Sequence, residues 1–233
     1  MRESGTNEPA DGSGRVKKLA WWQETILLLV LAVAVSALVK AFLVQMFFVP
    51  SGSMVPQFVK NDRILVEKIS YWTGGPERGD VIVFRDPGRW LGVAPKPTGL
   101  HGLLSTVGLY PQGGHLVKRV IGVGGDRVEC CDDEGRVMIN GVSLDETAYL
   151  REGISPSDRP FDVVVPADHL WMMGDNRSNS QDSRAHQSRP GGGSVPLDDV
   201  VGKVWAIVWP SDRMEVLDDP ATFDNPELDA EKD

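Results

Sequence analysis

The sequence is poor in cysteine, in aromatic residues and in positive charge. Its only two cysteines, Cys130 and Cys131, are adjacent, a spacing that fits neither a metal site nor a disulfide framework. A vicinal disulfide stays open, but two separate, half-buried side chains are the favoured interpretation. With 24 Lys and Arg against 33 Asp and Glu, no basic stripe is available to bind phosphates. We therefore expect no metal, no cofactor and no nucleic-acid partner.

One long hydrophobic run stands out from an otherwise ordinary globular composition. Residues 26–49 are almost wholly apolar, and Lys40 and Gln45 interrupt them only near the end. As a helix this run would be about 36 Å long, which is enough to cross a bilayer. It is too long for a cleaved signal peptide, and it lacks the recurring polar face of a core helix. We predict a transmembrane helix at 21–49, after a disordered cytoplasmic segment at 1–20.

Beyond residue 60 the pattern changes to short apolar runs that are rich in β-branched residues and separated by Gly, Pro and Asp. Residues 132–135 (Asp-Asp-Glu-Gly) and the pair Asn140-Gly141 are typical of hairpin turns. We predict a mainly β domain at 50–212, followed by an acidic, disordered tail at 213–233. The predicted strands are 64–66, 81–84, 116–123, 137–139, 163–165, 170–173 and 200–209.

Residues 86–114 form a long connection, rich in Gly and Pro, between two of the predicted strands. Connections of this length without secondary structure are usually functional or mobile. We hypothesise that the apolar side chains of Trp90, Leu91, Leu103 and Leu104 rest on a membrane surface.

The first turn-forming stretch after the apolar run is 50–56 (Pro-Ser-Gly-Ser-Met-Val-Pro). Pro50 and Pro56 restrict φ and lack an N–H donor, while Gly52 allows backbone angles that are closed to other residues. The stretch therefore predicts an ordered, non-helical loop that could hold a reactive serine. A plain surface turn is the alternative, and these residues alone do not decide between the two.

A serine nucleophile needs a base, and the sequence offers histidine or lysine. No histidine lies in a motif that places it beside Ser53, although a Ser–His–Asp triad stays open. Lys118 lies on the predicted strand 116–123, where burial would lower its pKa, whereas Arg119 would stay protonated. Because side chains alternate along a strand, we expect only one of these two cations to face the core. A solvated strand edge is the alternative.

Residues 174–184 (Gly-Asp-Asn-Arg-Ser-Asn-Ser-Gln-Asp-Ser-Arg) place many short polar groups directly after an apolar strand. A calcium loop of the EF-hand type is excluded, because counting from Asp175 puts Arg177 at the third position and His186 at the twelfth. Such a run can satisfy its own backbone through turns, and it can hold a lysine by hydrogen bonds.

Taken in order, these stretches resemble the bacterial type I signal peptidases, membrane-anchored Ser–Lys proteases that remove signal peptides from exported preproteins. Gln57 stands where the family often has threonine, and Gly124 where it often has proline. The motifs that carry the resemblance follow the apolar run and are 50–56, 78–84 (Arg-Gly-Asp-Val-Ile-Val-Phe), 118–126 (Lys-Arg-Val-Ile-Gly-Val-Gly-Gly-Asp) and 174–184.

The resemblance implies an antiparallel sheet of partial-barrel form in a single-pass protein of the plasma membrane. It implies that the N-terminus lies in the cytoplasm and that the catalytic domain at 50–212 is extracytoplasmic. It implies secretory preproteins with small residues at the cleavage site as substrates, and the lipid bilayer as a partner. A non-catalytic, membrane-anchored β-domain that binds envelope proteins is the alternative. The implied roles are nucleophile for Ser53, general base for Lys118, oxyanion-hole donor for Ser51, lysine orientation for Ser180, and support of the site for Asp175, Asp182 and Arg184.

Overall fold

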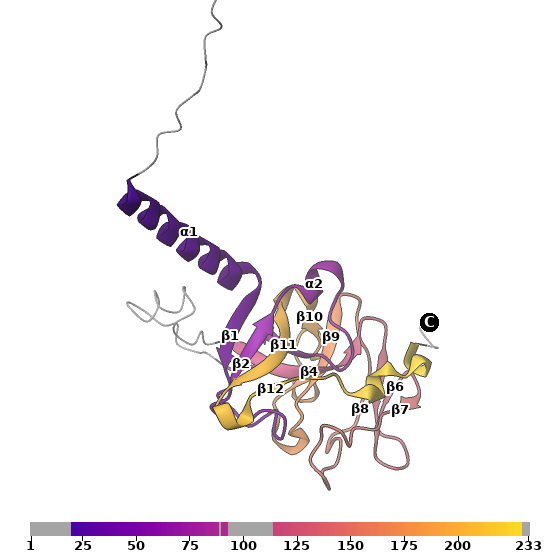
Figure 1. Ribbon diagram of the computed structural model, residues 1–233. Coiled ribbons are helices and arrows are strands. Elements are labelled where there is room, and N and C mark those ends of the chain that lie inside the picture. The colour runs from indigo at the N-terminus through magenta and orange to yellow at the C-terminus, as the bar shows by residue number, and fades with distance from the viewer. Residues whose placement is uncertain (1–19, 89, 93–113, 230–233) are drawn as a thin grey trace, which may run out of the picture. The chain divides into compact units, whose positions relative to one another are not determined.

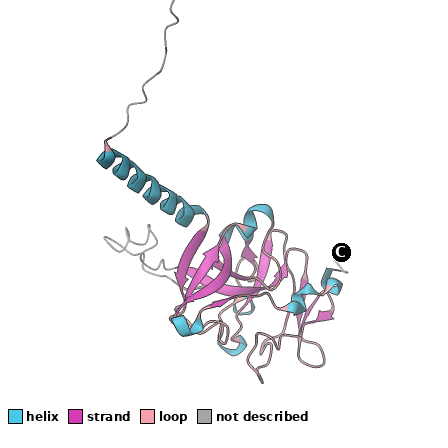
Figure 2. Ribbon diagram, viewed as in Figure 1, coloured by secondary structure: helices cyan, strands magenta, loops and turns pink. Residues whose placement is uncertain are grey.

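The computed structural model describes residues 20–88, 90–92 and 114–229, with the backbone alone at 37–42 and 72–73 (Figure 1). The chain divides into two units, Met1–Val39 and Lys40–Asp233. Helix α1 (Trp21–Phe42) forms most of the described part of the first unit, and all the described strands belong to the second (Figure 2).

Every residue of helix α1 from Ile26 to Val35 is apolar, so this part of the helix is apolar on all sides. Its large hydrophobic side chains from Trp21 to Val35 are between 50% and 80% exposed. Within the part of the chain that the structure describes, no helix combines the length and the apolar content that crossing a membrane would require. The transmembrane helix therefore stays a prediction.

The helix is shorter than the predicted span, because it ends at Phe42 and the chain continues as strand β1 (Val44–Phe48). Strand β1 pairs antiparallel with β2 (Arg63–Glu67), with Phe47 opposite Ile64. A helix that continues to residue 49 is thus wrong. A largely apolar run does not show where a helix changes to a strand. Here the change to a strand follows from the hydrogen bonds that residues 44–48 make with β2.

The larger of two antiparallel sheets has eight strands and curves into a half-barrel (Figure 1). Its strand order is β1-β2-β11-β3-β4-β9-β10, and β12 pairs with β11. The mainly β, partial-barrel prediction is confirmed, and each predicted strand overlaps an observed one. The further strands of this sheet are β3 (Val81–Arg85), β4 (His115–Val123), β9 (His169–Met173), β10 (Val195–Pro196), β11 (Val200–Trp209) and β12 (Glu215–Val216).

The smaller sheet has four strands in the order β7-β6-β5-β8. Both predicted hairpin turns are confirmed, and at the second one Asn140 and Gly141 have positive φ angles of 49° and 78°. Cys130 and Cys131, at the end of β5, are joined in a vicinal disulfide, so the interpretation as two separate side chains is wrong. The strands are β5 (Arg127–Cys130), β6 (Val137–Ile139), β7 (Val142–Ser143) and β8 (Phe161–Val164).

Short helical turns connect the strands. They are α2 (Ser70–Thr73) and the 3₁₀ turns η1 (Arg177–Asn179), η2 (Ser183–Ala185), η3 (Leu197–Asp199), η4 (Ser211–Arg213), η5 (Ala221–Asp224) and η6 (Pro226–Asp229).

Strands β3 and β4 are buried on both faces of the large sheet. Along β3, Val81 and Val83 pack in one hydrophobic cluster, while Ile82 and Phe84 pack in another. The alternation of side chains along a strand explains this division. Residues 81–84 of β3 and 118–122 of β4 are therefore buried whichever face they point to.

The first turn of the 86–114 connection packs against the domain. The Trp90 ring stacks on His186 with centroids 4.3 Å apart and also meets the edge of Phe84. These two rings cover part of Trp90, which is half-buried, and the hypothesis that it rests on a membrane stays a prediction. Leu91 is half exposed, and Leu103 and Leu104 lie outside the described residues.

The predicted disordered tail is wrong as far as residue 229. Residues 215–229, which we term the C-terminal strap, begin with β12 and pass along the domain (Figure 1). Phe223 lies against Gly79, Leu228 is fully buried, and Asn140 Nδ2 donates to the Leu228 carbonyl over 2.7 Å. The acidic composition of the segment predicted disorder, because it outweighed the signal from these two apolar residues.

We predict that Leu228→Ala lowers the free energy of unfolding by about 2–5 kcal/mol, because it leaves a cavity in the core of the small sheet. Denaturant unfolding of the full chain measures the change. Val164→Ala, at an exposed position of β8, should change that free energy by less than about 1 kcal/mol. If both substitutions changed the free energy of unfolding by the same small amount, the buried Leu228 side chain would add no more to stability than an exposed one.

Candidate active site

Residues 50–56, here termed the serine loop, form an ordered series of turns. The loop starts from Val49, whose N–H donates to the Asp62 carbonyl over 2.9 Å. Buried side chains of Met54 and Phe58 anchor its other end, and the Phe58 N–H donates to the Met54 carbonyl. The predicted ordered loop is confirmed.

An ion pair holds the chain just beyond the serine loop. Arg213 of η4 binds the buried Asp62 carboxylate, with Nε 3.1 Å from Oδ1, and also donates to the Gln57 carbonyl. Asp62 in turn accepts a hydrogen bond from the Val59 N–H. Gln57 takes part through its backbone, so the departure from threonine at this position does not remove the contact.

Ser53 and Lys118 meet, although 65 residues separate them in sequence. The Lys118 Nζ atom lies 2.6 Å from Ser53 Oγ and also donates to the Val117 carbonyl over 3.0 Å. The exposed Ser51 directs its Oγ towards Ser53 Oγ at 3.4 Å. The structure therefore joins three of the residues that the sequence singled out.

The surroundings of Lys118 suit a base. Burial lowers its pKa to about 8, although Asp182 and Asp175 act in the opposite direction and Arg184 adds to the lowering. Roughly one-tenth of the amines would then be neutral at pH 7, and half at pH 8. A neutral amine in contact with a hydroxyl can accept its proton.

Residues 174–184, here termed the polar loop, approach the serine loop through their first residues. A side chain at Gly174 would collide with the Ser53 carbonyl and with Ser180, so only glycine permits this approach. Asn176 makes two hydrogen bonds to the serine loop, one from its backbone N–H to the Ser53 carbonyl and one from Nδ2 to the Gly52 carbonyl. The sequence analysis assigned no role to Asn176.

Ser180 lies beside Gly174, and its Oγ is buried. Within the described residues this hydroxyl makes no hydrogen bond of ordinary geometry, although it helps to lower the pKa of the Asp182 carboxyl. The second acceptor of Lys118 is the Val117 carbonyl. The hydrogen bond expected between Ser180 and Lys118 is thus not seen. The role of Ser180 in orienting the lysine stays a prediction.

Asp182 and Arg184 brace the polar loop from within. Arg184 places Nη2 2.8 Å from Asp182 Oδ2, and the Gly174 N–H donates to the same oxygen over 3.0 Å. Burial opposes the charge of Asp182, but Arg184, the Gly174 N–H and the Ser180 hydroxyl together outweigh it and hold the pKa of that carboxyl below its usual value. The carboxylate therefore stays charged while it fixes the start of the loop.

Asp175 forms a buried ion pair with Arg119. The guanidinium binds both carboxylate oxygens at 2.9 and 2.8 Å, donates to the Gly79 carbonyl, and lies over the ring of Tyr149 at 4.4 Å. Lys118 and Arg119 are both buried, so the expectation that only one would face the core is wrong. Apolar residues at alternate positions on both faces of 116–123 are typical of a central strand, and this signal could have predicted it.

A second buried pair, between Arg177 and Glu146, follows directly on Asp175 and Asn176. Arg177 Nη1 lies 2.8 Å from Glu146 Oε2, and the Arg177 backbone carbonyl accepts from Arg184. The sequence analysis missed this pair, because Glu146 lies on a distant turn whose burial no local pattern indicates.

His169 and His186 do not supply a base for Ser53. His169 and His186 each place Nδ1 2.8 Å from a backbone carbonyl, and His115 lies beside the ring of Phe47. Neither His169 nor His186 contacts Ser53, and His101 lies outside the described residues. In the described part of the chain, no group of His, Cys, Asp and Glu is arranged to hold a metal ion.

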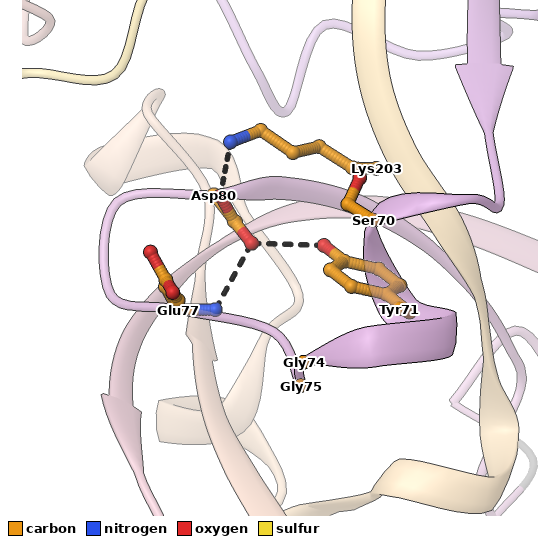
Figure 3. A pocket seen from close by; sticks show the side chains of 7 residues that line it. All are labelled: Ser70, Tyr71, Gly74, Gly75, Glu77, Asp80 and Lys203. Carbon is orange, nitrogen blue, oxygen red and sulfur yellow. Dashed lines mark hydrogen bonds and ion pairs between the residues drawn. The ribbon is translucent and has the colours of Figure 1, made fainter.

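A cavity of about 250 Å³ lies beside α2, and no residue of its lining hydrogen-bonds to Ser53 or Lys118 (Figure 3). Its polar groups bind one another: Asp80 accepts from Tyr71 over 2.9 Å and lies 2.6 Å from Lys203 Nζ. Burial and the Asp80 carboxylate raise the pKa of Tyr71 above its ordinary value. The lining residues are Ser70, Tyr71, Gly74, Gly75, Glu77, Asp80 and Lys203.

Comparison with known proteins identifies related sequences over almost the whole chain. A family model described as signal peptidase, peptidase S26, matches residues 22–209. The signal peptidase I of Mycobacterium tuberculosis is 37% identical over 240 residues, covering 91% of this chain and 79% of that protein. The probable signal peptidase I of Mycobacterium leprae is 35% identical, with 88% and 82% covered. The solved signal peptidase I of Enterococcus faecalis matches 55% of this chain and 95% of its own, at 26% identity and a TM-score of 0.35.

We predict that Asp175→Asn lowers the free energy of unfolding by about 3–5 kcal/mol, because Arg119 would keep a buried charge without its counter-charge. Denaturant unfolding at neutral pH measures the effect. The matched control is Asp162→Asn, which removes an exposed carboxylate that binds Arg127 in the same two-oxygen geometry. This control should leave stability essentially unchanged, because solvent screens the exposed pair. A harmless Asp175→Asn would contradict the structural role of the buried pair.

Proposed function

The chain belongs to the S26 family of signal peptidases, which are serine peptidases, and on that premise we propose that it cleaves signal peptides from exported preproteins with Ser53 and Lys118. The observation that carries the proposal is the 2.6 Å contact between Ser53 Oγ and the buried Lys118 Nζ. Such a contact joins a nucleophile to a base whose pKa is suited to proton transfer near neutral pH.

The proposed reaction is acyl transfer in two steps. Ser53 Oγ attacks the scissile carbonyl carbon while Lys118 accepts the hydroxyl proton, and the ammonium then gives that proton to the leaving amine. Water hydrolyses the acyl-enzyme with Lys118 again as the base. The oxyanion of each tetrahedral intermediate accepts hydrogen bonds from Ser51 Oγ and the Ser53 N–H. The distance of 3.4 Å between the two serine hydroxyls supports this role for Ser51.

The proposed substrates are secretory preproteins with small side chains in an Ala-X-Ala-like cleavage motif. We propose that the cleavage site binds as an extended strand against the sheet, since backbone hydrogen bonds can read differing sequences. The names of the relatives support the substrate class.

We propose that α1 anchors the protein in the plasma membrane, with residues 1–20 in the cytoplasm and the β-domain outside. A helix that is hydrophobic all round is typical of a protein core or a membrane span, and the described side chains of α1 are exposed. Arg15, Lys17 and Lys18 precede the helix, as expected for a cytoplasmic N-terminus. The serine loop follows α1 closely in sequence, so anchoring would raise its effective concentration at the membrane where signal peptides emerge.

We predict that Ser53→Ala and Lys118→Arg each lower kcat for preprotein cleavage by at least about 10³-fold, because one loses the nucleophile and the other exchanges the amine for a permanent cation. Cleavage of a preprotein by the full chain in detergent measures this loss. His169→Ala should keep wild-type turnover. Activity in Ser53→Ala would favour a non-catalytic role for the site, and turnover by Lys118→Arg would exclude lysine as the base.

We predict that kcat/KM rises with pH through a single limb centred near pH 8 and then levels off. The sign follows from the mechanism: below its pKa of about 8 the Lys118 amine is protonated and cannot accept the Ser53 proton. Initial rates with a preprotein between pH 6 and 10 measure the limb. A limb centred near pH 6.5, the ordinary pKa of histidine, would instead indicate a histidine base.

A further inference from the structure

Asn176 binds the two carbonyl groups that flank Ser53 in the backbone. Its own N–H donates to the Ser53 carbonyl over 3.0 Å, and its side-chain Nδ2 donates to the Gly52 carbonyl over 2.8 Å. Two hydrogen bonds from one residue thus fix two successive peptide groups of the serine loop.

The bond from Asn176 to the Gly52 carbonyl, which is shorter than the 3.3 Å bond that the same carbonyl accepts from the Val55 N–H, also helps to determine where the Ser53 N–H points. The Gly52 carbonyl and the Ser53 N–H belong to one peptide plane, which is trans, so they point in opposite directions. With the carbonyl turned towards Asn176, the N–H is directed away from Asn176. Among the described residues the Ser53 N–H donates to no acceptor, so it is available to a ligand.

This peptide needs an anchor because glycine precedes it. Gly52 has no Cβ, and its backbone can reach conformations that other residues cannot. Rotation of the Gly52–Ser53 peptide by half a turn would replace the N–H with a carbonyl oxygen, which would repel the oxyanion instead of stabilising it.

Asn176 is itself held rigidly. Its neighbours in sequence, Asp175 and Arg177, are both locked in buried ion pairs, with Arg119 and Glu146 respectively. Its carbonyl accepts the Asn179 N–H over 2.9 Å. The two ion pairs therefore bracket the residue that contacts the serine loop, and a rigid donor can hold a flexible peptide in one orientation.

We propose that Asn176 is a positioning residue for the oxyanion hole: its Nδ2 holds the Gly52–Ser53 peptide so that the Ser53 N–H faces the scissile carbonyl. The inference rests on the proposed function and adds a residue that acts through Ser53 without touching the substrate. The backbone N–H of Asn176 would keep its bond to the Ser53 carbonyl in any variant, so side-chain substitution tests the Gly52 contact alone.

The experiment compares Asn176→Ala and Asn176→Asp in the full chain, with cleavage of a preprotein as the assay. Losing an oxyanion donor outright lowers kcat by on the order of 10²–10³, so losing its orientation in Asn176→Ala should lower kcat by about 10–100-fold, with KM within about twofold. Asn176→Asp should be slower still, because its carboxylate oxygen would repel the Gly52 carbonyl. A role in packing alone predicts the reverse order, since aspartate matches asparagine in shape, and that order would overturn the proposal.

Gln181→Ala is the matched control, since it removes an exposed amide from the same loop and should keep wild-type kcat. Thermal unfolding of each variant shows whether the fold is retained. If Asn176→Ala does not fold, Asn176→Ser takes its place, because the serine side chain is polar but too short to reach the Gly52 carbonyl. A kcat within twofold of wild type in a folded variant would overturn the proposal.

A peptide aldehyde provides a second readout that a merely structural role would not change. Ser53 Oγ adds to the aldehyde carbon, the hydroxyl proton moves to the former carbonyl oxygen, and that oxygen occupies the oxyanion hole. In Asn176→Ala the inhibition constant should rise by about the same factor as kcat falls, while the pH limb stays near 8. Unchanged inhibition together with a lowered kcat, or a displaced limb, would overturn the proposal.

The two levels of inference fail separately. If Ser53→Ala still cleaves the preprotein, Ser53 is not the nucleophile and the proposed mechanism with Ser53 and Lys118 is wrong. If Ser53→Ala is inactive while Asn176→Ala and Asn176→Asp match wild type, only the role of Asn176 is wrong.

Discussion

The contact between Lys118 and Ser53 depends on keeping an amine out of water. A lysine at a surface would stay charged near neutral pH and could not take a proton from a hydroxyl, whereas burial lowers the pKa of Lys118 to about 8. Burial of the charged form costs free energy, so the site exists only because packed strands enclose it. This condition is met in the large sheet, because a hydrophobic cluster covers each face of its central strands.

Strand β4 connects the base to the loop that holds the serine. Lys118 points to one face and contacts Ser53, while Arg119 points to the other and binds Asp175 at the start of the polar loop. Asn176, the next residue after Asp175, donates hydrogen bonds to the backbone carbonyls of Gly52 and Ser53. A closed path of contacts thus runs from the base through the strand and the polar loop to the nucleophile. Such a path explains why buried ion pairs, which add little net stability, gather around this loop.

The predictions from sequence succeeded where the signal was local. The Asn140-Gly141 turn follows from the backbone angles that these two residues accept, and the strands follow from short runs of β-branched residues. They failed where the structure of a segment depends on a partner that is distant in sequence. Residues 44–48 became a strand because β2 offers a hydrogen-bonding edge, and the acidic tail became ordered because Leu228 finds a core to enter.

By itself, the sequence determined which chemistry was available: a serine in a rigid turn, a lysine on an apolar strand, and a polar loop, in the order typical of a known family. Only the tertiary structure decided that Lys118 and Arg119 are both buried and that Asn176 binds the backbone of the serine loop. The physical reason is that residue type and spacing encode backbone preference and reactivity, whereas burial and hydrogen-bond partners depend on segments that meet only after folding.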